Sequence, residues 1–200
     1  MRSPSPLSVS TVPPSETKNP VDSSHLGAVP ASRYVVYFAL AILGCGFDLW
    51  SKWAVFAWLG MPTQGRYFWL IEPYFGFQTS LNRGALFGLG QGYTPVFALF
   101  SVIAAIGILV WLFVAKAAHD WLLTAALGLI TGGIFGNLYD RLGLWGESAV
   151  RDFILFQYNR NYVWPNFNVA DMLLVVGAGL LLWHSFTAAP PNEISEKASA

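Results

Sequence analysis

Charged side chains are scarce in this chain of 200 residues, and their scarcity excludes an ordinary soluble domain. Asp, Glu, Lys and Arg together make up 11% of the sequence, whereas 54% of the residues are hydrophobic and 16% are aromatic. Soluble domains carry roughly a quarter of charged residues. The surplus apolar surface therefore needs lipid to face, which predicts a membrane protein.

Cysteine and an excess of positive charge are lacking as well. Cys45 is the single cysteine, so an intrachain disulfide and a cysteine-based metal cluster are excluded, and we interpret it as a small apolar residue. The formal net charge is zero, and no basic stripe with interleaved aromatic residues is present. Nucleic acid is therefore not expected as a partner. Neither a metal nor another cofactor is predicted.

Long apolar runs are present, and each is long enough to cross a bilayer as a helix. There are four such runs: residues 34–59, 94–115, 121–139 and 168–188. The segments that join them on one side contain shorter runs typical of strands. The predicted fold is a membrane all-α, four-transmembrane-helix bundle with a small β-sheet on its outer surface.

The expected sheet comes from two of the connecting segments. Residues 66–70 and 75–81 are predicted as short strands, separated by a turn at Glu72-Pro73. Residues 149–155 form another strand-like run that contains a charged pair. Residues 159–166 are polar and rich in turn formers.

The two ends of the chain differ from its middle in composition. Residues 1–32 contain six prolines and eight serines and almost no large apolar side chain, which predicts a disordered N-terminal tail. No secretory signal directly follows Met1. The membrane domain is predicted over residues 33–188, and residues 189–200 are predicted to be a mobile C-terminal tail.

The third apolar run combines glycines at helical spacing with polar residues at its end. On a helix these residues form two neighbouring stripes: Gly128, Gly132, Gly136 and Asp140 on one, and Gly133, Asn137 and Arg141 on the other. Glycines at this spacing let a second helix approach closely. The polar residues that end the stripes are therefore predicted to enter a contact between helices rather than lipid.

Four spans joined in sequence place the unusual polar residues on one membrane face. That face receives Asp48, Lys52, Asn82, Asn137, Asp140, Arg141, Asp152, Asn168 and Asp171. Asp48 and Lys52 lie one helical turn apart, in the favourable order for an ion pair. Because charges within a span are costly unless they face protein or water, we interpret this pair as a support for a site.

Two of the carboxylates, Asp140 and Asp171, are predicted to meet at a similar shallow depth. Asp140 lies within about one turn of the exit of the third run, and Asp171 lies about one turn inside the entry of the fourth. Two carboxylates in a partly desolvated site share one proton, which supplies a general base and a general acid together. The spacing leaves an alternative open: Asp140 only pairs with Arg141 or another cation, and Asp171 only caps a helix start.

Five short motifs follow one another between the first apolar run and the start of the fourth: residues 48–52 (DLWSK), 82–88 (NRGALFG), 132–141 (GGIFGNLYDR), 150–153 (VRDF) and 167–171 (FNVAD). Together they resemble the lipoprotein signal peptidases (signal peptidase II), which are membrane aspartic proteases of bacteria. The resemblance implies that Asp140 and Asp171 are the catalytic pair. The positions expected to support them or to bind substrate are Asn82, Asn137, Arg141, Asn168, Asp48, Lys52, Asp152 and Gly136.

The same resemblance implies a substrate and a location. The implied substrate is a prolipoprotein whose cysteine already bears diacylglycerol, cut just before that cysteine. Globomycin-type peptides are the implied inhibitors, and membrane lipid is the other expected partner. The implied location is the bacterial inner membrane, with the site facing the periplasm. The distribution of Lys and Arg does not by itself favour this orientation.

A small proton-coupled carrier or channel is the second hypothesis, because buried carboxylates can also relay protons. It requires a polar path across the membrane, whereas the polar residues here gather on one face. A non-catalytic membrane scaffold is the third hypothesis. The scaffold hypothesis does not explain why several polar motifs are present in this order.

Overall fold

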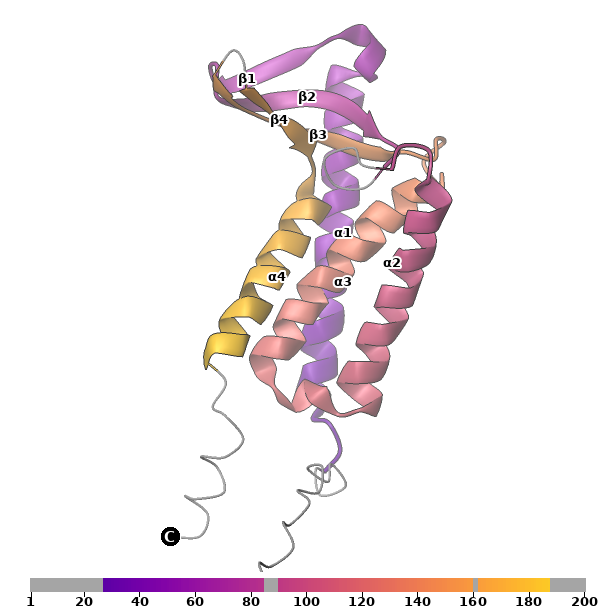
Figure 1. The fold of residues 1–200 in the computed structure, drawn as a ribbon, viewed down its shortest axis with the longest axis vertical. Helices are drawn as coiled ribbons and strands as arrows, with labels where there is room; N and C mark the ends of the chain where they lie inside the picture. Colours follow the sequence, from indigo (N-terminus) through magenta and orange to yellow (C-terminus); the bar gives the residue numbers. More distant parts are fainter. Residues whose placement is uncertain (1–26, 85–89, 160–161, 188–200) are drawn as a thin grey trace, which may run out of the picture.

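The structure is a computed structural model that describes residues 27–84, 90–159 and 162–187. Four long helices form a bundle (Figure 1): α1 (Ala31–Leu59), α2 (Thr94–Leu109), α3 (Trp121–Arg141) and α4 (Val169–Thr187). A π-helical turn, Val110–Val114, extends α2. Each helix falls in a segment long and apolar enough to cross a membrane. The four predicted spans are therefore confirmed.

An antiparallel sheet covers one end of the bundle, with its strands in the order of the sequence: β1 (Tyr67–Ile71), β2 (Phe75–Asn82), β3 (Val150–Asn159) and β4 (Tyr162–Phe167). The first three correspond to the predicted strands. The fourth strand was not predicted, because residues 159–166 are rich in turn formers, yet β4 pairs with β3 and places Val163 opposite Gln157. β4 is rich in aromatic and β-branched residues, and its proline is tolerated at the edge of a sheet.

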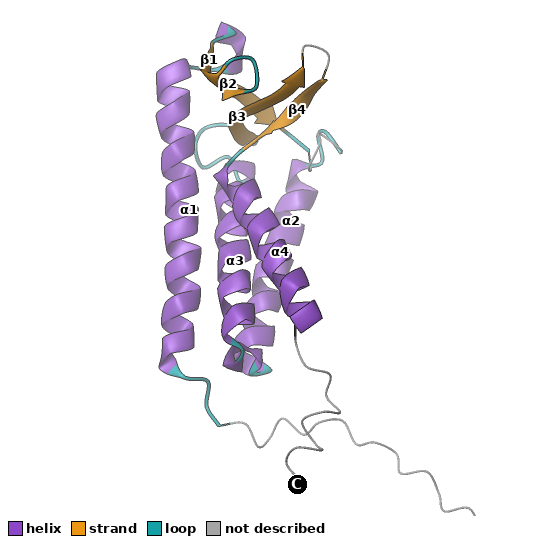
Figure 2. Cartoon of the chain, turned by 90° about the vertical axis from the view of Figure 1, so that its left-hand side faces the viewer, coloured by secondary structure: helices purple, strands orange, loops and turns teal. Residues whose placement is uncertain are grey.

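α3 lies at the centre of the bundle and packs against α1, α4 and α2 (Figure 2). A methyl group added to Gly132 would lie 3.1 Å from the carbonyl oxygen of Ala41 in α1. One added to Gly133 would meet the carbonyl oxygen of Ala170 in α4. The two neighbouring glycine stripes therefore bring α1 and α4 against adjacent faces of α3. The sequence predicts such close contacts, but not which helices make them.

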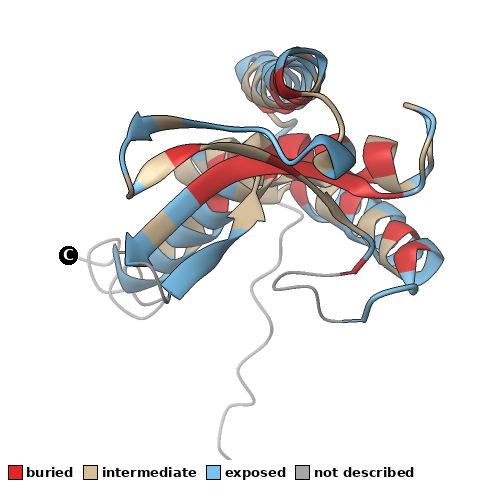
Figure 3. Ribbon diagram, turned by 90° about the horizontal axis from the view of Figure 1, so that it is seen from above, coloured by how far each residue is buried: buried red, intermediate tan, exposed pale blue. Residues whose placement is uncertain are grey.

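The sheet is fixed to the bundle by an apolar cluster that joins the end of α1 to β3. Val55 and Leu59 of α1 pack there with Phe153 and Ile154 of β3. The first part of β3 is buried, and Figure 3 shows buried segments of the sheet above the helix ends. This packing sets the polar residues at the start of β3 directly over the ends of α3 and α4.

The domain boundaries stay predictions. α1 begins at Ala31, so the last two residues of the predicted tail 1–32 belong to a helix. Residues 1–26 and 188–200, which include the whole predicted C-terminal tail, lie outside the described residues. Residues 85–88 of the second motif also lie outside them.

Candidate active site

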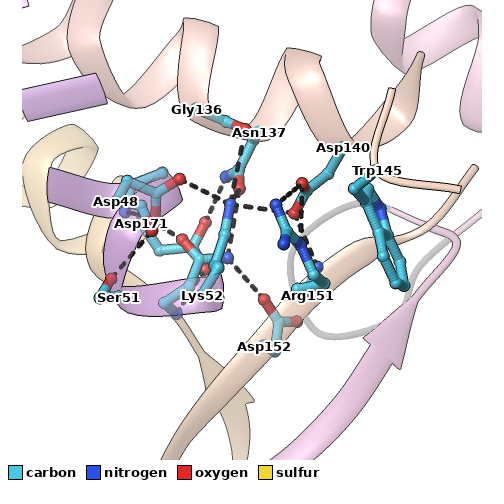
Figure 4. A network of polar contacts seen from close by, with 12 residues as sticks. Asp48, Ser51, Lys52, Gly136, Asn137, Asp140, Trp145, Arg151, Asp152 and Asp171 are labelled. Carbon is cyan, nitrogen blue, oxygen red and sulfur yellow. Dashed lines mark hydrogen bonds and ion pairs between the residues drawn. The ribbon is translucent and has the colours of Figure 1, made fainter. Parts of the chain in front are cut away.

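Polar side chains from α1, α3, α4 and β3 gather where the sheet meets the bundle (Figure 4). Lys52 is fully buried among them. Its Nζ lies 2.7 Å from Asp48 Oδ2 and 3.2 Å from Asp140 Oδ2, and it donates a hydrogen bond of 2.9 Å to Asn137 Oδ1. A buried ammonium needs such partners because its desolvation is costly. The predicted Asp48–Lys52 pair therefore forms, and it connects α1 to α3.

Asp48 also connects α1 to the beginning of α4. Its Oδ1 accepts a hydrogen bond of 2.8 Å from the backbone N–H of Ala170. This N–H belongs to the first turn of α4, where backbone donors have no partner within the helix. One buried carboxylate thus holds α4 and Lys52 in place together.

Asp140 is held by two cations. Its Oδ1 accepts hydrogen bonds from Nη2 and Nε of Arg151, at 2.7 and 3.1 Å. Its Oδ2 accepts one from the backbone N–H of Arg151, at 2.9 Å, and also faces Lys52. The side chain is fully buried, and both oxygens are occupied. These contacts do not fit the predicted Asp140–Asp171 pair. The alternative of a cation-paired Asp140 is what forms, with Lys52 and Arg151 in place of Arg141.

Asp171 is positioned by the residue that immediately precedes α4. The backbone N–H of Asn168 donates to Asp171 Oδ2 at 3.2 Å, and the N–H of Asp171 donates to Asn168 Oδ1 at 3.0 Å. This reciprocal pair is a capping box, which satisfies two free donors of a helix start. Asn137 Nδ2 donates to the other oxygen of Asp171 at 2.9 Å. Asp171 therefore caps α4, and its carboxylate is also held in a fixed position where the sheet meets the bundle.

Asp152 of β3 is a second carboxylate beside Asn168. Asn168 Nδ2 donates to its Oδ1 at 2.6 Å, so a single fully buried asparagine contacts both Asp152 and Asp171. Burial raises the pKa of Asp152 to about 7, and repulsion by Asp171 adds to this rise. Hydrogen bonds from Asn168 and Asn82 and the charge of Lys52 oppose it. Asp152, rather than Asp140, is thus the carboxylate that shares Asn168 with Asp171.

A polar cavity of about 470 Å³ gives access to Asp152. Its walls include Gln78 and Asn82 of β2 and Asn166 of β4, together with Asp152 itself. Asn82 also accepts a hydrogen bond from the backbone N–H of Gly84 at 2.9 Å, which fixes its amide. A peptide backbone placed in this cavity would find donors and acceptors along its walls.

Comparison with known proteins decides the family. Residues 40–187 match the family model described as signal peptidase (SPase) II. The chain belongs to this family. A lipoprotein signal peptidase of Rhodopirellula baltica is 51% identical over 183 residues, which cover 87% of this chain and 82% of the relative. One of Symbiobacterium thermophilum is 38% identical over 145 residues, which cover 72% and 90%.

A solved structure agrees with this membership in signal peptidase II. A bacterial membrane enzyme determined by the in meso method at 2.3 Å resolution superimposes with a TM-score of 0.66 and 25% identity. The match covers 76% of this chain and 88% of that one. The chain is thus a peptidase of the signal peptidase II family and a multi-pass membrane protein.

Within this signal peptidase II, Arg141 does not pair with Asp140. Its guanidinium lies 5.9 Å from the centre of the Phe97 ring. Its Nε is buried and has no hydrogen-bond partner among the described residues. The expected role of Arg141 in binding substrate stays a prediction.

Sequence reasoning missed the role of Arg151. Arg151 and Asp152 were interpreted as one charged pair in a strand, yet consecutive side chains of a strand point to opposite faces. Arg151 accordingly reaches Asp140, whereas Asp152 faces Asn168. The alternation of the predicted strand was the signal that could have separated the two.

Gly136 supports the site by leaving room for Asp48. A methyl group at this position would meet the Asp48 carboxylate and lie 3.3 Å from Ala170 Cβ. We expect Gly136→Ala to displace Asp48 and to lower the free energy of unfolding by about 1–3 kcal/mol. Thermal unfolding in detergent measures this loss. Gly107→Ala in α2 is the control, because nothing lies within 4 Å of its added methyl group. Equal melting temperatures of the two variants would contradict the close approach at Gly136.

Proposed function

We propose that this signal peptidase II is an aspartic endopeptidase that removes the signal peptide from diacylglyceryl prolipoproteins. It cuts before the lipidated cysteine, with Asp152 and Asp171 as the catalytic pair. The curated relatives carry the name lipoprotein signal peptidase, which supports this class of substrate. The observation that carries the catalytic pair is the contact of Asn168 with both carboxylates, together with the pKa of about 7 at Asp152.

The geometry supports a division of roles between the two carboxylates. Asp171 accepts hydrogen bonds from Asn137 and from the Asn168 backbone, which stabilise its ionised form. Asp152 holds the shared proton. Asp171 takes a proton from water, the resulting hydroxide adds to the scissile carbonyl carbon, and Asp152 gives its proton to the carbonyl oxygen. When the tetrahedral species collapses, the proton held by Asp171 passes to the leaving amine and the shared proton returns to Asp152.

The position of the pair suits a substrate embedded in a membrane. The site lies at one end of four membrane-spanning helices, under a sheet. An apolar signal helix can lie along the bundle while the acyl chains of the substrate stay in lipid. The scissile bond then reaches the seam between bundle and sheet. We place this face on the periplasmic side of the inner membrane.

Purified protein tests this proposal directly. It is expected to cleave a diacylglyceryl prolipoprotein before the modified cysteine, to leave the unlipidated precursor intact, and to be inhibited by a globomycin-type peptide. Mass spectrometry of the products identifies the bond that is cut. Absence of cleavage, combined with proton flux in liposomes, would support the carrier hypothesis instead.

The pH dependence of cleavage follows from the pKa of Asp152. Asp152 must be protonated to donate to the carbonyl, so activity is expected to fall as the pH rises through about 7. A second, acidic limb is expected where Asp171 loses its charge, and both limbs belong to the pair. Initial rates between pH 4 and pH 9 at saturating substrate measure the profile. A rate that stays constant across the neutral range would contradict the assignment of Asp152 as the acid.

A further inference from the structure

A continuous apolar groove runs between α1 and α3, and neither Asp152 nor Asp171 lines it. Its inner part has a volume of about 660 Å³ and is lined by apolar residues such as Phe38, Ile42 and Phe135. Its outer part, of about 490 Å³, is lined by Trp53, Trp145 and Arg151. Leu49 and Tyr139 line both parts, so the two are contiguous. We call this feature the α1–α3 groove.

The chemistry of the α1–α3 groove changes along its length. The inner part lies wholly on membrane-spanning helices and the turn after α3, and it is almost entirely apolar. The outer part adds indole rings and one guanidinium. Tryptophan is typical of the depth at which lipid headgroups lie. The groove therefore has a hydrocarbon end and a headgroup end.

Arg151 retains unused donors at the headgroup end. Its Nε and Nη2 bind Asp140, and its guanidinium lies 4.9 Å from the centre of the Trp145 ring (Figure 4). No hydrogen bond or ion pair joins its Nη1 to the described residues. A guanidinium that lines a cavity with free N–H groups suits a phosphate.

We propose that the α1–α3 groove binds one phospholipid of the surrounding bilayer, with an acyl chain in the inner part and the phosphate on Arg151. These helices are surrounded by the hydrocarbon of the bilayer, so a lipid acyl chain is the molecule available to fill the groove. The groove from Phe38 to Trp53 follows α1 for about 22 Å, at ~1.5 Å per residue. One leaflet contributes about half of the ~30 Å hydrocarbon core, so the groove can hold a chain of that leaflet.

Native mass spectrometry of the purified full chain tests the proposal with two defined lipids. Phosphatidylglycerol carries the phosphate, and diacylglycerol with the same acyl chains lacks it. We expect one saturable phosphatidylglycerol per chain, bound at least about tenfold more tightly than diacylglycerol. Gly46→Leu should weaken this binding at least about tenfold. Gly46 lines the groove, and nothing lies within 4 Å of an added Cβ, so the new side chain fills the space without disturbing the helix.

Gly107→Leu is the matched control for this test. It places the same side chain on the exposed face of α2, again with open space around the added Cβ, and should leave phosphatidylglycerol binding unchanged. Equal affinity for the two lipids, or an unaltered affinity of Gly46→Leu, would overturn the proposal. So would the binding of many lipids without saturation.

Cys45 gives a second readout that does not depend on a variant. It is the single cysteine of the chain, it lines the groove and it is partly exposed. Added phosphatidylglycerol should slow its reaction with N-ethylmaleimide severalfold, and diacylglycerol at the same concentration should not. A labelling rate that neither lipid changes would overturn the proposal. Both readouts are independent of proteolysis, so their outcome is separate from that of the cleavage assay.

Discussion

Asp152→Asn and Asp171→Asn are each expected to lower the turnover number at least about 10³-fold while the protein stays folded. Asp152→Asn removes the proton that the carbonyl oxygen must receive, and Asp171→Asn removes the base that activates water. Asn82, Asn168 and Asn137 can still donate to the amide oxygen that replaces each carboxylate. Single-turnover cleavage of a lipidated precursor, with equal amounts of folded variant, measures the loss.

Thermal stability separates this loss of chemistry from unfolding. Folding raises the pKa of Asp152 from 3.8 to about 7. The stability linked to this proton is therefore complete below pH ~4 and is lost as the pH rises through about 7. Asp152→Asn has no such loss. Its melting temperature should exceed that of the unmodified protein at pH 8, and the difference should shrink toward pH 5. An inactive variant that also melts earlier at pH 8 would contradict this account.

Asp140→Asn is expected to fail in the opposite way, by loss of folding. The substitution removes one of the two carboxylates that neutralise the buried side chains of Lys52 and Arg151. Breaking a buried ion pair from one side typically costs about 3–5 kcal/mol, because a charge is left without compensation. Thermal unfolding in detergent and the yield of monodisperse protein measure the effect. A stable but inactive Asp140→Asn would return Asp140 to the catalytic pair.

Asp120→Asn provides the matched control for Asp140. Asp120 Oδ2 lies 2.7 Å from His184 Nε2 at the other end of the bundle, and the side chain of Asp120 is 42% exposed. It also accepts a hydrogen bond from the backbone N–H of Leu123 at the start of α3, and asparagine can accept the same bond. Exposed pairs contribute little, so the change should stay within about 1 kcal/mol. If Asp120→Asn lowered the free energy of unfolding as much as Asp140→Asn, the burial of Asp140 would not explain the instability of Asp140→Asn.

The helices and the gathering of polar residues could be predicted because both follow from local patterns. Run length and low charge give the four spans. The i, i+4 glycines of α3 predict close contacts with other helices, and Gly132 and Gly133 make such contacts with α1 and α4. The connectivity of four spans then fixes which end receives Lys52, Asn137 and Asp171. None of these steps requires knowledge of a specific side-chain contact.

The choice between carboxylates could not be predicted, because it depends on partners distant in the chain. Asp140 and Asp152 both lie near the end of the bundle that holds the site. Their spacing in the sequence alone does not show which of them lies beside Asp171. The distinction arises when β3 crosses the end of α3 and delivers Arg151 to Asp140 and Asp152 to Asn168. β4 was missed for a related reason, since its pairing with β3 outweighs the turn-forming residues near it.

Infrared spectroscopy of the carboxyl groups tests the central claim most directly. A protonated carboxylic acid has a carbonyl stretching band distinct from that of a carboxylate. We expect the unmodified protein to show such a band that disappears as the pH rises through about 7. The band should be absent at neutral pH from Asp152→Asn and should remain in whatever folded Asp140→Asn can be recovered. A band that survives in Asp152→Asn and disappears in Asp140→Asn would contradict the assignment of the shared proton to Asp152 and Asp171.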